Sequence, residues 1–94
     1  MFEWDEAKSE ANLKARGFDF AHAAGIFDGP VLEIDDTRAD YGERRVQAIG
    51  KTGPDILFVV YTWRGDVRRI ISARLANRKE RGIYGKVFGG TSTP

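Results

Sequence analysis

The sequence predicts one α+β domain, in which two N-terminal helices and one C-terminal helix pack on an antiparallel β-sheet. Apolar residues at helical spacing are confined to the first 30 positions, and alternating or β-branched runs follow from 31 to 74. Helices grouped before hairpin-linked strands are typical of α+β folds. The predicted order is β-α-α-β-β-β-β-α, with one face of the sheet left open for a ligand. We place the domain at residues 1–88 and a flexible tail at 89–94.

Start and stop signals define the first elements. A short apolar strand is expected at 2–4, and Asp5 can cap a helix that stops at Gly17. Asp19 offers a second cap, and the helix after it has one apolar face. The breaker sequence at 28–30, Asp-Gly-Pro, ends this second helix.

Four strands are expected after the two helices. A short strand at 31–34 is followed by a polar loop and then by a strand at 44–51, with apolar and polar residues alternating. The run ILFVVYTW at 56–63 is β-branched and aromatic throughout, as in a central strand with both faces covered. The RGD tripeptide at 64–66 predicts a tight turn, which joins this strand to the last one at 67–74 as a hairpin.

Alternation on the last strand divides its side chains between two faces. We expect Ile71 and Ala73 to pack on the helices. The open face then carries Arg68, Ser72 and Arg74. Arg64 is expected beside them, at the end of the preceding strand.

The last helix is expected to begin after Asn77, a favourable N-cap, and to run through about Tyr84. Asn77, Arg81 and Tyr84 stand at i, i+4 and i+7, so they lie along one stripe of the helix.

Charge is distributed unevenly along the chain. Residues 1–60 carry seven Lys/Arg and twelve Asp/Glu, a net −5, whereas residues 61–94 carry eight and two, a net +6. The segment 68–84 alone has six cations, five of them arginine, against one acid. A guanidinium group matches phosphate with two parallel donors and stacks on bases, so the bias toward arginine favours a polyanion site over a merely solvated face.

Several classes of function are excluded or unsupported. The chain has no cysteine, and its one histidine, His22, cannot build a metal site alone, so we read it as a structural residue at or near the surface. No phosphate-binding glycine motif and no nucleophile elbow occur, so we expect neither cofactor nor metal. No apolar run is long enough to span a bilayer and the N-terminus is acidic, which predicts a cytoplasmic protein without a membrane partner.

The candidate residues follow from this arginine-rich surface. Without a metal or two imidazoles, phosphodiester cleavage needs cations to neutralise the negative charge that develops on the phosphorane, and the 2′-hydroxyl as nucleophile, so it would act on RNA and not on DNA. The candidate catalytic residues are Arg64, Arg74, Arg81 and Tyr84. The candidate substrate-binding residues are Lys8, Arg16, Arg68, Arg69 and Arg78. Tyr84 would transfer a proton or stack on a base, and Lys8 is a weaker proton-transfer candidate.

A series of short motifs resembles one family along nearly the whole chain. They are MFEWDEAK at 1–8, N-x-x-x-x-G-x-x-F at 12–20, F-D-x-P at 27–30, ERR at 43–45, IG at 49–50, YTWR at 61–64, RIISAR at 69–74 and ER-x-x-Y at 80–84. In this order they are similar to the BrnT family of bacterial type II toxins. The resemblance implies a RelE/ParE-like fold and a ribonuclease that blocks translation. It also implies neutralisation by a BrnA-type antitoxin with a ribbon-helix-helix domain, through which alone the complex would bind operator DNA.

One departure from the family pattern concerns catalysis. The family has Lys-His-Gly before the second helix, where this chain has Ala15-Arg16-Gly17. A guanidinium group does not release its proton near neutral pH, so Arg16 can bind phosphate but cannot act as an acid or base.

Two other functions remain open on the sequence. The chain could be a ParE-like toxin that binds a protein target without catalysis, in which case Arg64 and Arg74 would be interface residues. It could also be an RNA-binding domain that does not cleave.

Overall fold

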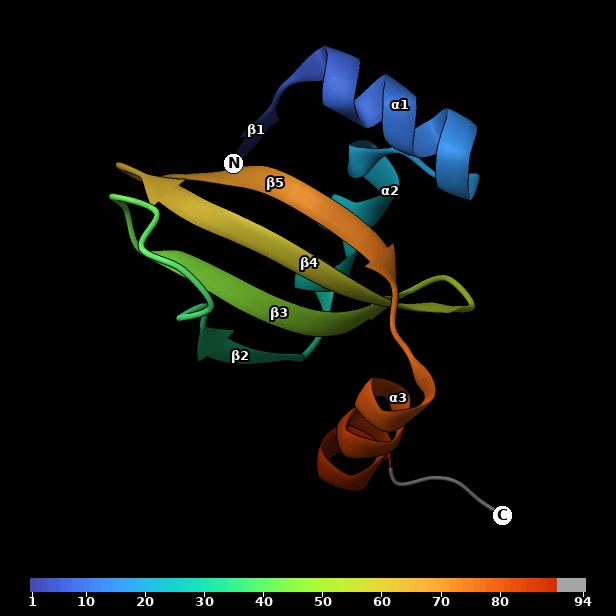
Figure 1. The fold of residues 1–94 in the computed structure, drawn as a ribbon. Helices are drawn as coiled ribbons and strands as arrows, with labels where there is room; N and C mark the ends of the chain where they lie inside the picture. The colour runs from blue at the N-terminus through green and yellow to red at the C-terminus, as the bar shows by residue number, and fades with distance from the viewer. Residues whose placement is uncertain (90–94) are drawn as a thin grey trace.

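The computed structural model describes residues 1–89 and consists of a curved sheet with helices on both sides (Figure 1). In chain order the elements are β1 (Phe2–Trp4), α1 (Glu6–Arg16), α2 (Phe20–Ala24), the 3-10 helix η1 (Gly25–Asp28), β2 (Val31–Asp35), β3 (Arg45–Thr52), β4 (Asp55–Arg64), β5 (Val67–Leu75), α3 (Arg78–Tyr84) and the π-helix η2 (Gly85–Gly89). The predicted order of elements is confirmed. The predicted tail lies outside the described residues, apart from Gly89, which ends η2.

The five strands form one sheet in the order β1-β5-β4-β3-β2. The α+β class is confirmed, with one difference from the antiparallel sheet that was expected. β2, β3, β4 and β5 pair antiparallel, whereas β1 pairs parallel with β5, from Phe2 opposite Arg68 to Trp4 opposite Ile70. β1 and β5 are not joined by a hairpin, so no turn constrains them to be antiparallel. Beyond Ile70 the outer edge of β5 pairs with no strand of the described residues.

The predicted helix caps are present. The Asp5 side chain accepts a hydrogen bond from the backbone N–H of Lys8 at 3.2 Å, and Gly17 ends α1 in the left-handed region with φ of 87°. The Asp19 side chain accepts from the backbone N–H of His22 at 2.9 Å, which fixes the start of α2. These caps depend only on neighbouring residues, and the sequence was sufficient to predict them.

The core lies between the sheet and the pair α1 and α2, while α3 packs under the opposite face (Figure 1). The buried cluster consists of Phe18, Phe20, Ala23, Ile26, Val46, Ala48, Leu57, Val59, Tyr61, Ile70 and Ala73. The central strand β4 is buried along most of its length, as its apolar sequence predicts.

An irregularity in β5 changes which residues share a face. The β4–β5 register shifts between Val60 and Tyr61, which pair with Ser72 and Ile70, so Ile71 is an additional residue on β5. Consequently Ile70 and Ala73 both point into the core, where Ile71 had been expected beside Ala73.

The prediction that Arg68, Ser72 and Arg74 line one face is therefore wrong. Arg68 pairs with Trp63 and lies on the core side of the sheet, whereas Arg74 pairs with Phe58 on the side of α3. Strict alternation holds for a regular strand, but a bulge exchanges the faces of all residues beyond it.

Candidate functional site

The candidate arginines lie at two ends of the β4–β5 hairpin. Arg64 pairs with Val67 beside the turn, and Arg74 pairs with Phe58, six β4 positions away. At roughly 3.3 Å per residue these positions are about 20 Å apart. Arg64 instead has a guanidinium nitrogen 3.8 Å from a carboxylate oxygen of Glu43. The structure does not bring Arg64 into one site with Arg74 and Arg81.

Arg74 is held in a fixed orientation at the end of β5. Its two terminal nitrogens donate to the two carboxylate oxygens of Glu80 at 2.8 and 2.9 Å, and one also donates to the carbonyl of Leu75. The guanidinium plane lies over the ring of Phe58, 4.1 Å from its centroid. The hydrogen bonds from Arg74 lower the pKa of the Glu80 carboxyl, and this effect is larger than the rise that burial of Glu80 causes. The carboxylate therefore stays ionised at neutral pH.

Helix α3 begins immediately after this arginine and carries further cations. Asn77 and Glu80 form a capping box, in which the Asn77 side chain accepts from the Glu80 N–H and the Glu80 carboxylate accepts from the Asn77 N–H, each at 2.8 Å. Glu80 therefore joins the start of α3 to Arg74. We call Arg74, Arg78, Lys79 and Arg81 the β5–α3 cation cluster; Glu80 is its one acid, which leaves a net charge of +3.

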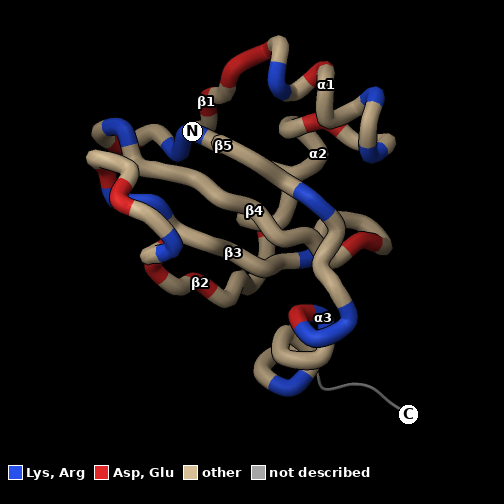
Figure 2. The backbone as a smooth tube through the Cα atoms, in the orientation of Figure 1, with Lys and Arg blue, Asp and Glu red and all other residues tan. Residues whose placement is uncertain are grey.

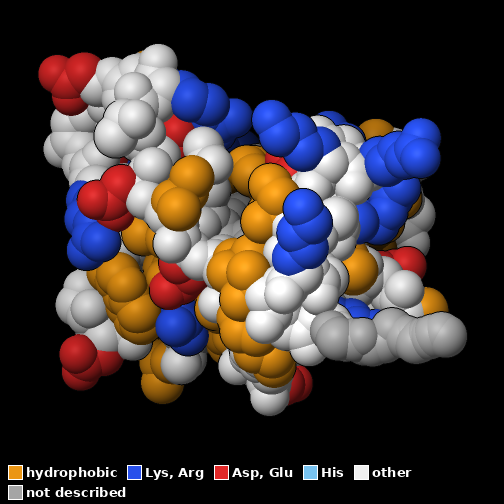
Figure 3. All heavy atoms as spheres, turned by 90° about the horizontal axis from the view of Figure 1, so that it is seen from below, with side chains coloured by type: hydrophobic (Ala, Val, Ile, Leu, Met, Phe, Trp, Pro, Cys, Tyr) orange, Lys and Arg blue, Asp and Glu red, His pale blue; other side chains and the backbone are white. Residues whose placement is uncertain are grey.

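The cation cluster lies on the outside of the molecule. Figure 2 shows Lys and Arg positions at the end of β5 and the start of α3, with one acidic position among them. Figure 3, which views the molecule from the side of α3, shows hydrophobic side chains in the middle of this face, with cations above them and along its right margin. Arg81 donates to the carbonyl of Ala76 at 2.7 Å, while the Arg78 side chain makes no hydrogen bond or ion pair with any residue in 1–89. The cluster thus contains arginines that hydrogen bonds hold in place, Arg74 and Arg81, and one whose side chain has no such bond, Arg78.

Tyr84 lies inside the molecule and not beside Arg74 at the surface. Its side chain is buried, and its hydroxyl donates to the carbonyl of Pro30 at 3.0 Å. The bond fixes the end of α3 against the loop before β2. The stripe predicted for Asn77, Arg81 and Tyr84 therefore begins at the surface and ends in the interior.

The two arginines at the start of β5 are engaged in different ways. The Arg68 guanidinium lies over the rings of Phe27 and Trp63, 4.2 and 4.6 Å from their centroids, on the core side of the sheet. Arg69 donates to a Glu3 carboxylate oxygen at 3.1 Å across the β1–β5 pair. Neither joins the β5–α3 cation cluster.

Lys8 and Arg16 border a shallow groove along the outer edge of β5. Both side chains project from α1, and the groove is closed on the other side by Ile71 and Ser72. Arg16 also borders a second hollow, at the C-terminal end of α1. Arg16 therefore lies between the groove and this hollow.

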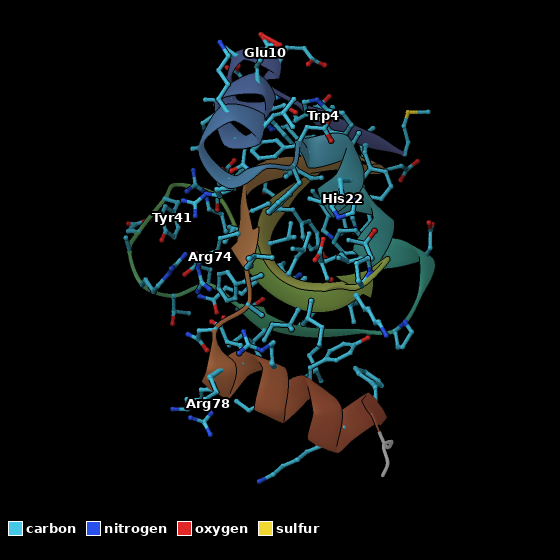
Figure 4. The ribbon with its side chains drawn as sticks, turned by 90° about the vertical axis from the view of Figure 1, so that its right-hand side faces the viewer. Trp4, Glu10, His22, Tyr41, Arg74 and Arg78 are labelled. Atoms are coloured by element: carbon cyan, nitrogen blue, oxygen red, sulfur yellow. The ribbon has the colours of Figure 1, made fainter. Side chains whose placement is uncertain are left out.

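The second hollow contains a pair that sequence reasoning missed. His22 of α2 and Asp55, the first residue of β4, approach to 3.1 Å between Nε2 and a carboxylate oxygen. They are 33 positions apart and no local motif joins them. The two residues come together only in the folded chain. Figure 4 looks onto this end of the molecule, with His22 beneath α2 and Arg74 beside the end of β5.

Two further findings concern metals and membranes. Within the described part of the chain, no group of three or more His, Cys, Asp or Glu side chains is placed to bind a metal ion. No helix among residues 1–89 has the length and apolar character needed to cross a bilayer.

These features define the class of protein. It is a small α+β domain whose strand–helix junction carries several arginines on its surface, a distribution of charge that is common on nucleic-acid-binding proteins. Residues 4–80 match the family model of BrnT, the ribonuclease toxin of type II toxin-antitoxin systems. The chain belongs to this family. The match includes Arg64 and Arg74 and ends at Glu80, before Arg81 and Tyr84. A search of curated proteins found no match.

Proposed function

We propose that this protein is a metal-independent endoribonuclease, the toxin of a type II toxin-antitoxin pair, and that it inhibits translation in the cytoplasm by cleaving RNA. The observation that carries the proposal is the β5–α3 cation cluster, in which Glu80 and Phe58 orient the Arg74 guanidinium next to three more cations. An oriented guanidinium group stabilises the charge that develops on a phosphate in the transition state at little reorganisation cost.

The residues of the cluster would bind different phosphates of the RNA substrate. Arg74 and Arg81 hold the scissile phosphate, and Arg78 binds a neighbouring one. Lys8 and Arg16 extend the basic track along the groove beside β5, and Arg64, Arg68 and Arg69 would contact RNA farther along the hairpin. The proton-transfer role of Tyr84 stays a prediction, because its hydroxyl would first have to leave the Pro30 carbonyl.

The partner would be a BrnA-type antitoxin, with which the toxin forms a hetero-oligomer. Blocking a basic substrate site is the simplest way to neutralise the enzyme, and an acidic segment would be attracted to the β5–α3 cation cluster. DNA would be bound only through the antitoxin.

The test is incubation of the purified protein with RNA in excess EDTA, with and without ribosomes. We expect cleavage that persists in EDTA and falls at least about 100-fold in Arg74→Ala, as when a transition-state donor is removed. Arg44→Ala is the matched control, because Arg44 pairs with Asp35 at the far edge of the sheet. Circular dichroism would verify that both variants are folded.

Two outcomes would contradict the proposal. Cleavage that stops in EDTA and returns when a divalent cation is added would show that the enzyme needs a metal ion. No cleavage by the free protein, alone or with ribosomes, would favour instead a toxin that binds a protein target. The two hydrogen bonds from the Arg74 guanidinium to Glu80 are also compatible with that alternative, in which the pair would be part of an interface.

A further inference from the structure

His22 and Asp55 form a polar pair in the hollow at the end of α1 and outside the β5–α3 cation cluster. The hollow encloses about 420 Å³, within the usual range of ligand pockets. Its lining consists of Leu13, Arg16, Gly17, Phe18, Asp19, His22, Asp55 and Leu75. The His22 and Asp55 side chains are about one-third exposed, at 34% and 38%, so a ligand in the hollow can reach them.

The hydrogen bond to Asp55 determines which nitrogen of His22 carries the proton. A carboxylate can only accept, so the 3.1 Å contact requires the proton on Nε2. In neutral imidazole the lone pair is then on Nδ1. Nδ1 has no hydrogen-bond partner among residues 1–89. The ring is further held by the Phe18 ring, 5.7 Å away between centroids. The arrangement is that of an oriented base with a free acceptor atom.

A cation that can hold a phosphate lies in the same hollow. Arg16 forms no ion pair with any residue of the described chain, and it lines both this hollow and the groove that continues along β5. Of the two acids in the lining, Asp55 is paired with His22, and the Asp19 side chain accepts from the backbone N–H of His22.

The hollow adjoins the β5–α3 cation cluster. The backbone N–H of Ala76 donates to the carbonyl of Ile56 at 2.9 Å, so the residue after Asp55 touches the segment that joins β5 to α3. Leu75, which lines the hollow, follows Arg74 directly in the chain. An RNA strand bound by the cluster can therefore enter the hollow around the free edge of β5.

We propose that His22 is a proton-transfer residue of this ribonuclease, that Asp55 is its positioning residue, and that Arg16 binds a phosphate next to the scissile one. The proposal rests on the proposed function. His22 Nδ1 takes the proton from the ribose 2′-hydroxyl, and the 2′-oxygen forms a bond to phosphorus. The bond from phosphorus to the 5′-oxygen breaks, and that oxygen takes a proton from water. The resulting hydroxide is neutralised by the proton on His22. The products are a 2′,3′-cyclic phosphate and a 5′-hydroxyl.

The central experiment compares cleavage by His22→Gln and the wild type. Loss of a general base lowers kcat by about 10²–10⁴-fold. We expect a fall in that range with little change in KM, and unchanged binding of an uncleavable 2′-O-methyl RNA. Asp55→Asn should lower kcat by about 10–100-fold, as loss of a group that orients a catalytic imidazole does. Asp66→Asn, in the exposed β4–β5 turn, is the matched control.

Chemical rescue distinguishes a proton-transfer role from a structural one. His22→Ala leaves space for a small base, so added imidazole should restore part of its cleavage rate. No rescue, together with wild-type rates for folded His22→Gln and Asp55→Asn, would overturn the proposal. If Arg74→Ala is inactive in the same assay, the proposed function stands while this inference fails. If the wild type itself does not cleave, both fail.

Discussion

Arg74 illustrates how one side chain connects fold and site. Its guanidinium is bound by Glu80, by the Leu75 carbonyl and by the face of the Phe58 ring. Glu80 in turn caps α3. A change at Arg74 should therefore affect the substrate site and the start of the helix together.

Arg74→Lys tests this connection. An ammonium group cannot make the two parallel bonds to Glu80, so the depression of the Glu80 pKa should decrease and its carboxyl should titrate at higher pH. The carboxyl carbon of Glu80, followed by NMR, measures the effect. Arg78→Lys is the control, because Arg78 makes no ion pair within residues 1–89. Identical Glu80 titration in Arg74→Lys and the wild type would contradict the prediction.

Asp36 gives a second prediction at this scale. Its buried carboxylate accepts from Arg38 twice at 2.8 Å and from Gln47 at 3.2 Å, and the Arg38 bonds hold its pKa well below the usual range. A lowered folded pKa stabilises the protein above the unfolded value of about 3.9, and this contribution is lost as pH falls. Asp36→Asn should cost about 2 kcal/mol at pH 7.

Urea unfolding between pH 7 and pH 2.5 checks this expectation. The stability difference between the wild type and Asp36→Asn should decrease below about pH 4. Asp40→Asn, which removes an exposed carboxylate, should show little effect at either pH. A difference that stays constant with pH would mean that ionisation of Asp36 does not stabilise the fold.

At the scale of elements, β3 is packed tightly against η1. Gly50→Ala would place a Cβ 2.7 Å from the Cβ of Ile26 and 2.9 Å from a methyl group of Val31. We expect a loss of about 1–3 kcal/mol from overpacking. Gly82→Ala, in α3 with no atom within 4 Å, should instead stabilise by about 0.5–1 kcal/mol. Thermal unfolding of both variants is the measurement, and equal melting temperatures would contradict the contrast.

The elements also show what the sequence could and could not predict. The caps at Asp5, Asp19 and Asn77 were predictable because each is a bond between residues three positions apart. The bulge at Ile71 was not, because it depends on how β4 and β5 align across the ladder. Its effect was large, since it moved Arg68 and Arg74 to opposite faces.

At the scale of the whole molecule, the acidic first part of the chain contrasts with the basic last third. This charge asymmetry was evident from the sequence, and the structure gathers four of the cations at one junction. Contacts between residues of distant segments could not be predicted. His22 and Asp55, for example, form a contact although they are 33 positions apart and share no motif. Charge alone left the class of function undecided, and the family match placed the chain among ribonuclease toxins.

RNA binding should depend on salt to a degree set by the β5–α3 cation cluster. Single strands release about 0.7 counterion per neutralised phosphate, so the four cations of the cluster should contribute about −2 to −3 to the slope of log K against log salt. Lys79→Gln should reduce this slope by about 0.7. Fluorescence anisotropy with 2′-O-methyl RNA gives the slope, and Lys51→Gln on β3 serves as the control. A slope near zero would exclude phosphate binding by the cluster.

The parallel pair of β1 and β5 has a consequence for synthesis. Glu3 and Arg69, which bond across this pair, are 66 positions apart. The first strand to be synthesised, β1, is therefore the last strand to pair, because its partner β5 emerges only after β2, β3 and β4. Contacts between such distant segments slow folding. Since the β5–α3 cation cluster is made still later, a nascent chain completes the proposed substrate site only when translation of this domain is nearly finished.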